Sequence, residues 1–253
     1  MMLRIFRKKS EDPTNGATDP MIPSAEYQPK VVREALNKTA QKSPHIYQQV
    51  TGRELQTNII EALSAEPHGR AQTALGVMGS LAGFSCLSAI YLKYERGEIS
   101  PDQDGFRVEV TDTGRRIFFG NLVNQALFDG ETSLWGMVSA TSKKLGALDL
   151  PDINDISAHV ERSCHTQAYG QPRLAEMHQP RDYPSNFVRY LMPSYLPLLQ
   201  KYDANTDKFP MSFGFAIQGL LEDSCEDLDP ATAAKVVMEC AIPMATLDPA
   251  EVF

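Results

Sequence analysis

Apolar residues recur every three to five positions along several stretches of the chain, as in amphipathic helices. One such stretch spans residues 45–63 and places apolar side chains at Ile46, Val50, Leu55, Ile59 and Leu63. Ser43 is a suitable N-cap for this helix, and Pro44 suits its first turn. An earlier helix is predicted to begin near Glu26. The first quarter of the chain is therefore expected to be helical after its start.

Residues 71–92 contain no charged side chain and predict a buried central helix. This stretch is flanked by Arg70 and Lys93 and has the length that a membrane span would need. It also contains several hydroxyl and amide side chains, and no second span accompanies it, so a core helix is the preferred interpretation. Small residues would let neighbouring helices approach it closely, namely Gly76, Gly79, Ala82 and Gly83.

The pattern changes to strict alternation only in residues 106–119, which predict a β-hairpin. Phe106, Val108 and Val110 alternate with polar residues, and the sequence Asp-Thr-Gly at 112–114 predicts the turn. An isolated two-stranded hairpin is marginally stable in water. The hairpin must therefore pack on a helix, or join a sheet with another strand or another subunit. The last possibility is a hint of dimerisation.

The second half of the chain contains further helix starts and stops. The predicted starts are Gly120-Asn121, Ser133, Pro151-Asp152 and Asp229-Pro230, and one more helix is marked by Phe213, Ile217, Leu220 and Leu221. Trp135 and Val138 are expected to be buried, and Pro243 is expected to end the last helix. The predicted fold class is mainly α: a multi-helix globular domain around a buried central helix, with one β-hairpin.

The beginning of the chain differs in composition from the remainder. Prolines and a glycine between residues 10 and 24 mark residues 1–25 as a flexible leader, followed by a single mostly helical domain at 26–253. Apolar and basic residues alternate near the start, in the sequence MMLRIFRKK. This segment could touch an anionic membrane or a partner, but a frayed terminus is the preferred interpretation. No other membrane contact is expected.

Composition excludes several classes of protein. With 253 residues, 42% hydrophobic and 22% charged, the chain has an ordinary globular composition, and not that of a collagen-like or wholly disordered protein. A net charge of −8 argues against broad nucleic-acid binding. Four cysteines without a C-x-x-C pair, and no apolar run suited to a signal peptide, predict a cytoplasmic protein with reduced thiols. Residues 1–50 are net basic, whereas residues 202–253 are strongly acidic.

No motif for phosphate, dinucleotide, zinc or calcium binding is found, so no metal or cofactor is predicted. Ser85 lies in an incomplete nucleophile-elbow sequence inside a predicted helix. Cys164 and His165 are adjacent, but neighbouring helical positions diverge, so a buried thiol and a surface imidazole are preferred. The acidic run at 222–229 could bind a cation or a basic partner, although a solvated helix junction is the better interpretation.

The segment from 165 to 210 is the most site-like part of the sequence. It is rich in proline, tyrosine and arginine and is expected to have little regular structure, and long segments of that kind are often functional. Guanidinium and phenol groups there could meet an anionic ligand or a partner. The candidate ligand-binding residues are Tyr169, Arg173, His178, Arg181 and Tyr183. The structural alternative is a proline-stiffened connection that wraps the core and buries its rings.

Three segments carry a resemblance to a known family. They are ALGVMGSLAGFSCLSA at 74–89, FFGNLVNQALFDGETSLW at 118–135 and VVMECAIPMATLDP at 236–249. In these segments the chain resembles a proteobacterial protein family of unknown function. The resemblance implies a bacterial cytoplasmic protein and brings with it no activity, ligand or catalytic residue.

Two main hypotheses for function follow. The first is a non-catalytic interaction or scaffold protein that associates with itself or with another protein, based on the unpartnered hairpin and the opposite charge of the two chain ends. The second is a protein or enzyme that binds a small anionic molecule through the 165–210 segment. Attachment to a membrane surface through the first nine residues is a third possibility.

Overall fold

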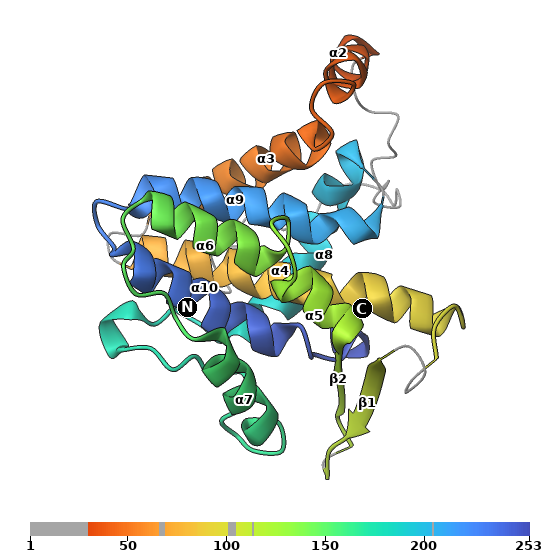
Figure 1. The fold of residues 1–253 in the computed structure, drawn as a ribbon, viewed down its shortest axis with the longest axis vertical. Helices are drawn as coiled ribbons and strands as arrows, with labels where there is room; N and C mark the ends of the chain where they lie inside the picture. The colour runs from red at the N-terminus through yellow and green to blue at the C-terminus, as the bar shows by residue number, and fades with distance from the viewer. Residues whose placement is uncertain (1–29, 66–68, 101–104, 113, 204) are drawn as a thin grey trace, which may run out of the picture.

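Most of the described chain is α-helical (Figure 1). The computed structural model describes residues 30–65, 69–100, 105–112, 114–203 and 205–253. The α-helices in these residues are α2 (Lys30–Ala40), α3 (Ile46–Ala62), α4 (Arg70–Glu95), α5 (Asn121–Phe128), α6 (Leu134–Lys144), α7 (Ile153–Ser163), α8 (Pro184–Tyr202), α9 (Phe209–Ser224) and α10 (Pro230–Met244). Strands β1 (Phe106–Val110) and β2 (Arg116–Gly120) form one antiparallel hairpin. The mainly α fold class is confirmed, whereas the predicted leader lies outside the described residues.

Helix α4 is the centre of the fold, as predicted. Helices α5, α8, α9 and α10 all pack against it. It is the single helix of the described chain that is long and apolar enough to cross a membrane, and 78% of its most apolar window is buried inside the protein. Such burial is typical of a core helix, because an apolar helix without a membrane must be covered by other helices.

Glycines on α4 let α10 approach it at backbone distance. A Cβ atom added at Gly79 would lie 2.6 Å from the carbonyl oxygen of Val237, and one added at Gly83 would lie 1.9 Å from that of Ala241. Both contact positions repeat after four residues on their helices, so one turn of α4 meets one turn of α10. The predicted close approach at these small residues is confirmed.

The hairpin is covered by its own chain. Phe118 lies 5.4 Å from the ring of Tyr91, and Phe106 lies 5.6 Å from that of Tyr94, so both strands pack on the end of α4. The outer edge of β2 also pairs with the C-terminal segment, through a bridge between Ile117 and Leu247. Of the predicted ways to cover the hairpin, the structure shows packing on a helix, together with a single bridge to another segment of the same chain.

Side-chain caps account for several helix starts. Ser133 accepts a hydrogen bond from the Gly136 N–H at the start of α6, and Asp152 accepts two at the start of α7. Asp229 caps α10 in the same way. The predicted cap of α3 is wrong: the N-cap is His45 instead of Ser43, because a turn at 44–45 intervenes.

Two other predictions need correction. Trp135, predicted to be buried, is only partly buried at the edge of the core, whereas Val138 is fully buried. Pro243 lies inside α10, which ends one residue later. Both errors concern side-chain direction or helix ends, which depend on tertiary contacts.

The segment from 165 to 210 is more regular than predicted, because it contains the 19-residue helix α8. An apolar stripe at Phe187, Leu191, Tyr195 and Leu199 faces the core at the helical spacing of four. Pro193 and Pro197 lie inside the helix, where each removes one backbone hydrogen bond. Pro197 leaves the carbonyl group of Pro193 without its helical donor. Because Pro193 is exposed, water can bind this carbonyl group instead. Burial of the stripe therefore outweighs the two prolines.

We expect Gly83→Ala to destabilise the protein by about 2–3 kcal/mol, although alanine is the better helix former, because the new methyl group must push α10 away from α4. Gly219→Ala is the matched control, since its methyl group would meet only the flexible end of Gln56. Urea unfolding should show a change of at most about 1 kcal/mol for this control. Equal losses for the two variants would contradict the close helix contact.

Candidate functional site

A cavity of about 390 Å³ lies where the hairpin turn, the loop after α7, the start of α8 and the C-terminal segment meet. Two arginines from different elements line it: Arg115 comes from the end of the hairpin turn, and Arg189 comes from the second turn of α8. Met244, at the end of α10, and Leu247, in the segment that follows, supply the apolar part of the wall. Four chain segments that are distant in sequence therefore build one pocket.

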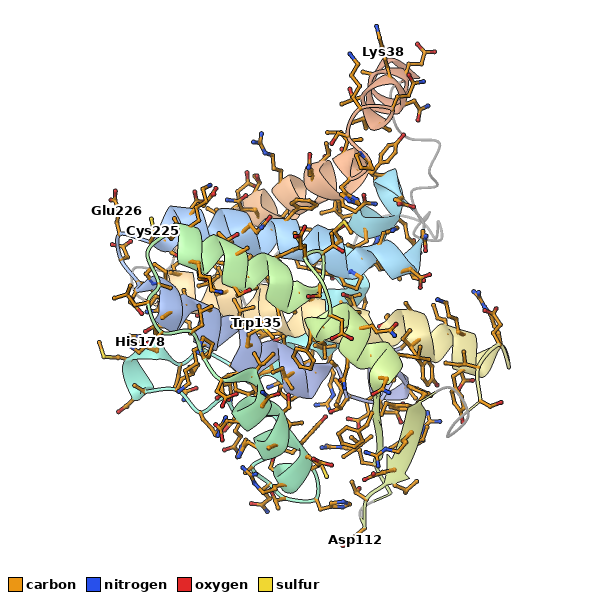
Figure 2. The ribbon with its side chains drawn as sticks, in the orientation of Figure 1. Lys38, Asp112, Trp135, His178, Cys225 and Glu226 are labelled. Atoms are coloured by element: carbon orange, nitrogen blue, oxygen red, sulfur yellow. The ribbon has the colours of Figure 1, made fainter. Side chains whose placement is uncertain are left out.

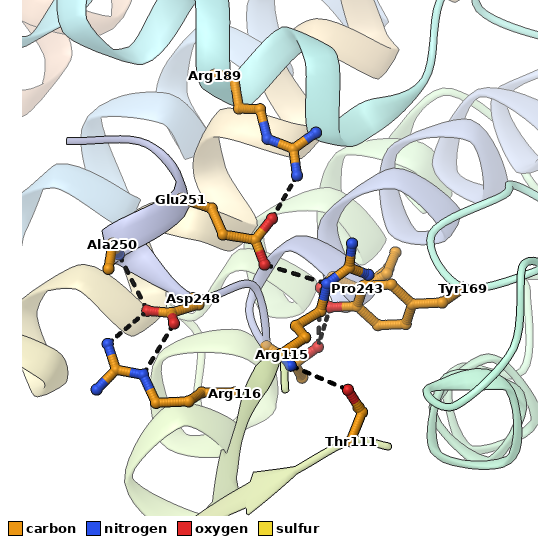
Figure 3. A network of polar contacts seen from close by, with 10 residues as sticks. Thr111, Arg115, Arg116, Tyr169, Arg189, Pro243, Asp248, Ala250 and Glu251 are labelled. Carbon is orange, nitrogen blue, oxygen red and sulfur yellow. Dashed lines mark hydrogen bonds and ion pairs between the residues drawn. The ribbon is translucent and has the colours of Figure 1, made fainter. Parts of the chain in front are cut away.

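Both arginines bind the same carboxylate, that of Glu251 (Figure 3). The Nε atom of Arg115 lies 3.1 Å from Oε1 of Glu251, and Arg189 contacts Oε2 through its Nη2 atom. Two guanidinium groups thus share one carboxylate beside the cavity, and a second carboxylate, that of Asp112, lines the cavity itself. The three side chains are only partly exposed, so solvent screens their interaction less than it would on an open surface.

The position of Glu251 follows from the hydrogen bonds of Asp248. Its carboxylate accepts a hydrogen bond from the Ala250 N–H at 3.0 Å and so starts the short helix η4 (Pro249–Glu251). The same carboxylate accepts two bonds from Arg116, at 2.9 Å from Nε and 3.0 Å from Nη2. Asp248 is buried, and its two partners fix the C-terminal segment on the hairpin. Glu251 is thereby brought to Arg115.

Tyr169 lies against Arg115 and forms part of the cavity wall. Its hydroxyl donates to the Pro243 carbonyl oxygen at 2.9 Å and lies 2.7 Å from Oγ1 of Thr246. The Arg115 guanidinium lies over its ring at 5.5 Å from the centroid, a cation–π distance. Desolvation by burial raises the pKa of this phenol to about 12, so it stays neutral at physiological pH.

The thiol in the cavity wall is unsuited to nucleophilic chemistry. Burial raises the pKa of Cys164, and the negative charge of Glu109 raises it further. A thiol of this kind is protonated at neutral pH, whereas the thiolate is the nucleophile. His165 next to it is exposed, so the predicted pair of buried cysteine and surface histidine is confirmed. The remaining polar lining consists of a second carboxylate, that of the exposed Asp112, and of hydroxyl and amide groups from Thr111, Thr166, Gln167 and Ser185.

Of the five candidate residues named from the sequence, only Tyr169 lines this cavity. Arg173 instead forms two ion pairs, at 2.9 Å with the exposed Asp155 and at 3.1 Å with the buried Glu239. Because Glu239 is 3% exposed, its charge requires such a partner. Arg173 therefore holds the loop after α7 against α10.

The other three candidates lie elsewhere. His178 belongs to the short helix η2 (Glu176–His178), and Figure 2 shows it on a different side of the molecule from Asp112 at the hairpin turn. Arg181 is exposed, and Tyr183 is the N-cap of α8 with 55% of its surface exposed. The five residues thus share a segment of sequence but not one site.

Arg115, which lines the cavity, and its partner Glu251 could not be chosen from the sequence. Arg115 stands in a predicted turn, and Glu251 stands near the end of an acidic stretch, where both read as ordinary surface charges. Arg189 belongs to the predicted segment, but nothing in its spacing sets it apart. Only the packing of hairpin, α8 and C-terminal segment brings the three together.

The other motifs considered in the sequence have structural roles. Ser85 is buried within α4 and donates to the Ala82 carbonyl oxygen at 2.7 Å. In the acidic run, Asp229 caps α10 and Glu222 pairs with Lys144 at 3.0 Å, as a helix junction requires. All four cysteines are free. Among the described residues, no cluster of three or more histidine, cysteine, aspartate or glutamate side chains could hold a metal ion.

Comparison with protein-family models, with curated proteins and with solved structures finds no match. The resemblance to a proteobacterial family therefore stays a prediction, and the case for function depends on the cavity itself.

We expect Tyr169→Phe to lower the free energy of unfolding by about 1 kcal/mol at pH 7, because the Pro243 carbonyl group loses one of its donors and keeps the Thr246 hydroxyl. Folding raises the pKa of this phenol from 10.0 to about 12, so the unfolded chain ionises first. The stabilising contribution is complete below pH 10 and is lost as the pH rises towards 12. The difference between wild type and variant should therefore narrow over that interval.

Tyr195→Phe is the matched control for this prediction. Tyr195 is 8% exposed, and burial raises its pKa to about 12 as well, but within the described chain no hydrogen bond of its hydroxyl is found. We expect a change of less than about 0.5 kcal/mol at pH 7, measured by chemical denaturation. A loss as large as that of Tyr169→Phe would assign the effect to burial and not to the hydrogen bond.

Proposed function

We propose that this protein binds a small organic carboxylate in the cavity between the hairpin turn, α8 and the C-terminal segment. The observation that carries the proposal is the pair of guanidinium groups, from Arg115 and Arg189, that converges on a single carboxylate, that of Glu251. Guanidinium groups bind carboxylates through charge-assisted hydrogen bonds, which are among the strongest that proteins form. The spacing of the two arginines therefore already suits one carboxylate group.

The rest of the lining supports a polar metabolite as the ligand. Thr111, Thr166 and Ser185 offer hydroxyl groups, and Gln167 offers an amide. Met244 and Leu247 offer a limited apolar wall. A volume of about 390 Å³ falls within the range of small-molecule sites. A ligand with one carboxylate and a hydroxylated or amide-bearing body would suit this polar lining, in which Asp112 provides a second carboxylate near the arginines.

Glu251 is the natural competitor of such a ligand. An incoming carboxylate must either displace it or share the two guanidinium groups with it, because both arginines already contact it. Removing the charge of Glu251 should therefore strengthen binding, whereas removing either arginine should weaken it. This opposition separates a carboxylate site from a cavity that binds ligands through shape alone.

The test is isothermal titration of the full chain with citrate, succinate, glutamate and inorganic phosphate. For whichever carboxylate binds, Arg189→Ala should weaken binding roughly 10- to 100-fold, the effect of one charge-assisted hydrogen-bond pair. Glu251→Gln should strengthen it about tenfold, because the competing charge is gone.

Lys93→Ala serves as the matched control, since it removes a partly exposed ion pair, with Asp207 at 3.1 Å, that lies outside the cavity. Its affinity should equal that of the wild type. If none of the carboxylates binds to either the wild type or Glu251→Gln, the proposal fails. Binding that both Glu251→Gln and Arg189→Ala leave unchanged would place the ligand elsewhere.

Self-association as a scaffold, in the cytoplasm of a bacterial cell, stays a prediction. Its first support was the hairpin, and that support is weaker because Phe106 and Phe118 are buried within their own chain. The second support is the charge contrast between the two chain ends, which is unchanged. The cavity supplies a more specific argument than either, so the ligand-binding function is preferred.

A further inference from the structure

A second hollow lies on another part of the molecule, along the outer surface of α9. It has a volume of about 1080 Å³ and is lined by residues of α3, α6 and α9. These three helices run in the same direction side by side, with α9 in the middle (Figure 1). Gln56 of α3 donates to Asp223 of α9 at 2.7 Å, and Gln218 of α9 donates to Thr141 of α6 at 2.9 Å. The hollow is therefore a groove with α9 as its floor.

The floor and walls of the groove are partly apolar. Ile46, Val50 and Ile60 of α3 and Phe215 of α9 line it and are only half-buried in the described structure. An apolar side chain that packs on these residues would remove its own surface and theirs from water, and this burial of apolar surface favours binding. The groove thus offers an apolar track that nothing in the described chain covers.

One end of the groove is acidic. Five exposed carboxylates gather at the end of α9 and in the turn that follows: Glu222, Asp223, Glu226, Asp227 and Asp229. Of these five, Glu222 and Asp223 line the groove, and the other three lie just beyond it. The groove also has two basic lining residues, Arg53 and Lys144, and Lys144 pairs with Glu222 at 3.0 Å. Figure 2 shows Glu226 and Cys225 at this end of the molecule. An occupant with apolar residues followed by basic residues would match both the track and this end.

We propose that residues 2–9 of the same chain occupy this groove. Their sequence, MLRIFRKK, combines apolar residues Leu3, Ile5 and Phe6 with four basic residues that end in Arg7-Lys8-Lys9. The apolar residues match the track between α3 and α9, and the terminal basic run matches the acidic end. The opposite charges of the two chain ends, which are evident from the sequence, thereby meet in one contact.

The connection is long enough for this arrangement. Residues 10–29 separate the basic run from Lys30, where α2 begins, and α2 packs on α3. Twenty residues can span up to about 70 Å, whereas the 17 residues of α3 are about 26 Å long. The segment can therefore reach any point of the groove. A tether of this length also keeps it at an effective concentration near the millimolar range, which favours binding within one chain.

The experiment uses the full chain with Lys9→Cys and a short bis-maleimide cross-linker. Cys225 is half-exposed at the acidic end of the groove, whereas Cys86, Cys164 and Cys240 are buried. The cross-linker bound to residue 9 should therefore react with Cys225. We expect a cross-link between residues 9 and 225 within one chain, identified by peptide mass spectrometry. Glu222→Lys with Asp223→Lys should lower its yield about fivefold, because the basic run then meets like charges. Phe215→Ala should also lower it.

Glu98→Lys with Glu109→Lys is the matched control, because it changes the net charge equally but lies just after the end of α4 and on β1, away from the groove. Its yield should equal that of the parent variant, and melting curves of all variants should show that each is folded. Absence of the cross-link would overturn the proposal. A yield that stays the same in the Glu222→Lys, Asp223→Lys variant as in the control variant would overturn it as well. A cross-link between two chains would overturn it too, in favour of a second copy as the occupant.

Discussion

The contact between α4 and α10 is the constraint on which the remaining structure depends. Gly79 and Gly83 bring the two backbones so close that no other residue type fits there without displacement of a helix. Because α10 lies in this fixed position along α4, the segment that follows it, with Leu247, reaches the hairpin that packs on the end of the same helix. The C-terminal segment then becomes the outer partner of β2. One steric condition in the core thus determines where the polar groups of the cavity meet.

Two carboxylates of the C-terminal segment bind the arginines of the hairpin and of α8, and these contacts form the site. Asp248 is buried and satisfied by Arg116 and by the backbone of η4, so its role is to hold the segment in place. Glu251 is more exposed and binds two arginines from elements that otherwise have separate tasks. A buried ion pair is costly to open, whereas a partly exposed one exchanges its partners more easily. This difference explains why Glu251, and not Asp248, is the carboxylate that a ligand would replace.

Much of the fold could be predicted from the sequence, because the signals were local. The uncharged stretch of α4, the alternation in the hairpin and the capping side chains Asp152 and Asp229 all depend on neighbouring residues. Helix α8 was missed because Pro193 and Pro197 suggest loop, while the burial that stabilises the helix is tertiary. The cavity could not be predicted for the same reason. Arg115, Arg189 and Glu251 are separated by more than sixty residues in each case, and no local pattern connects them.

The buried carboxylate of Glu239 explains why Arg173 has a structural role. Glu239 points from α10 into a nearly water-free environment, with 3% of its surface exposed, and a carboxylate in such a place must find a cation and hydrogen-bond donors. Arg173 supplies both, through its guanidinium group and through its backbone N–H at 3.1 Å. The loop after α7 is thereby attached to α10, and Tyr169, four residues earlier, comes within hydrogen-bond distance of Pro243. The arginine that the sequence suggested as a ligand-binding group is therefore the one that holds the wall of the cavity, and the cations left to meet a ligand are those that pair with the more exposed Glu251.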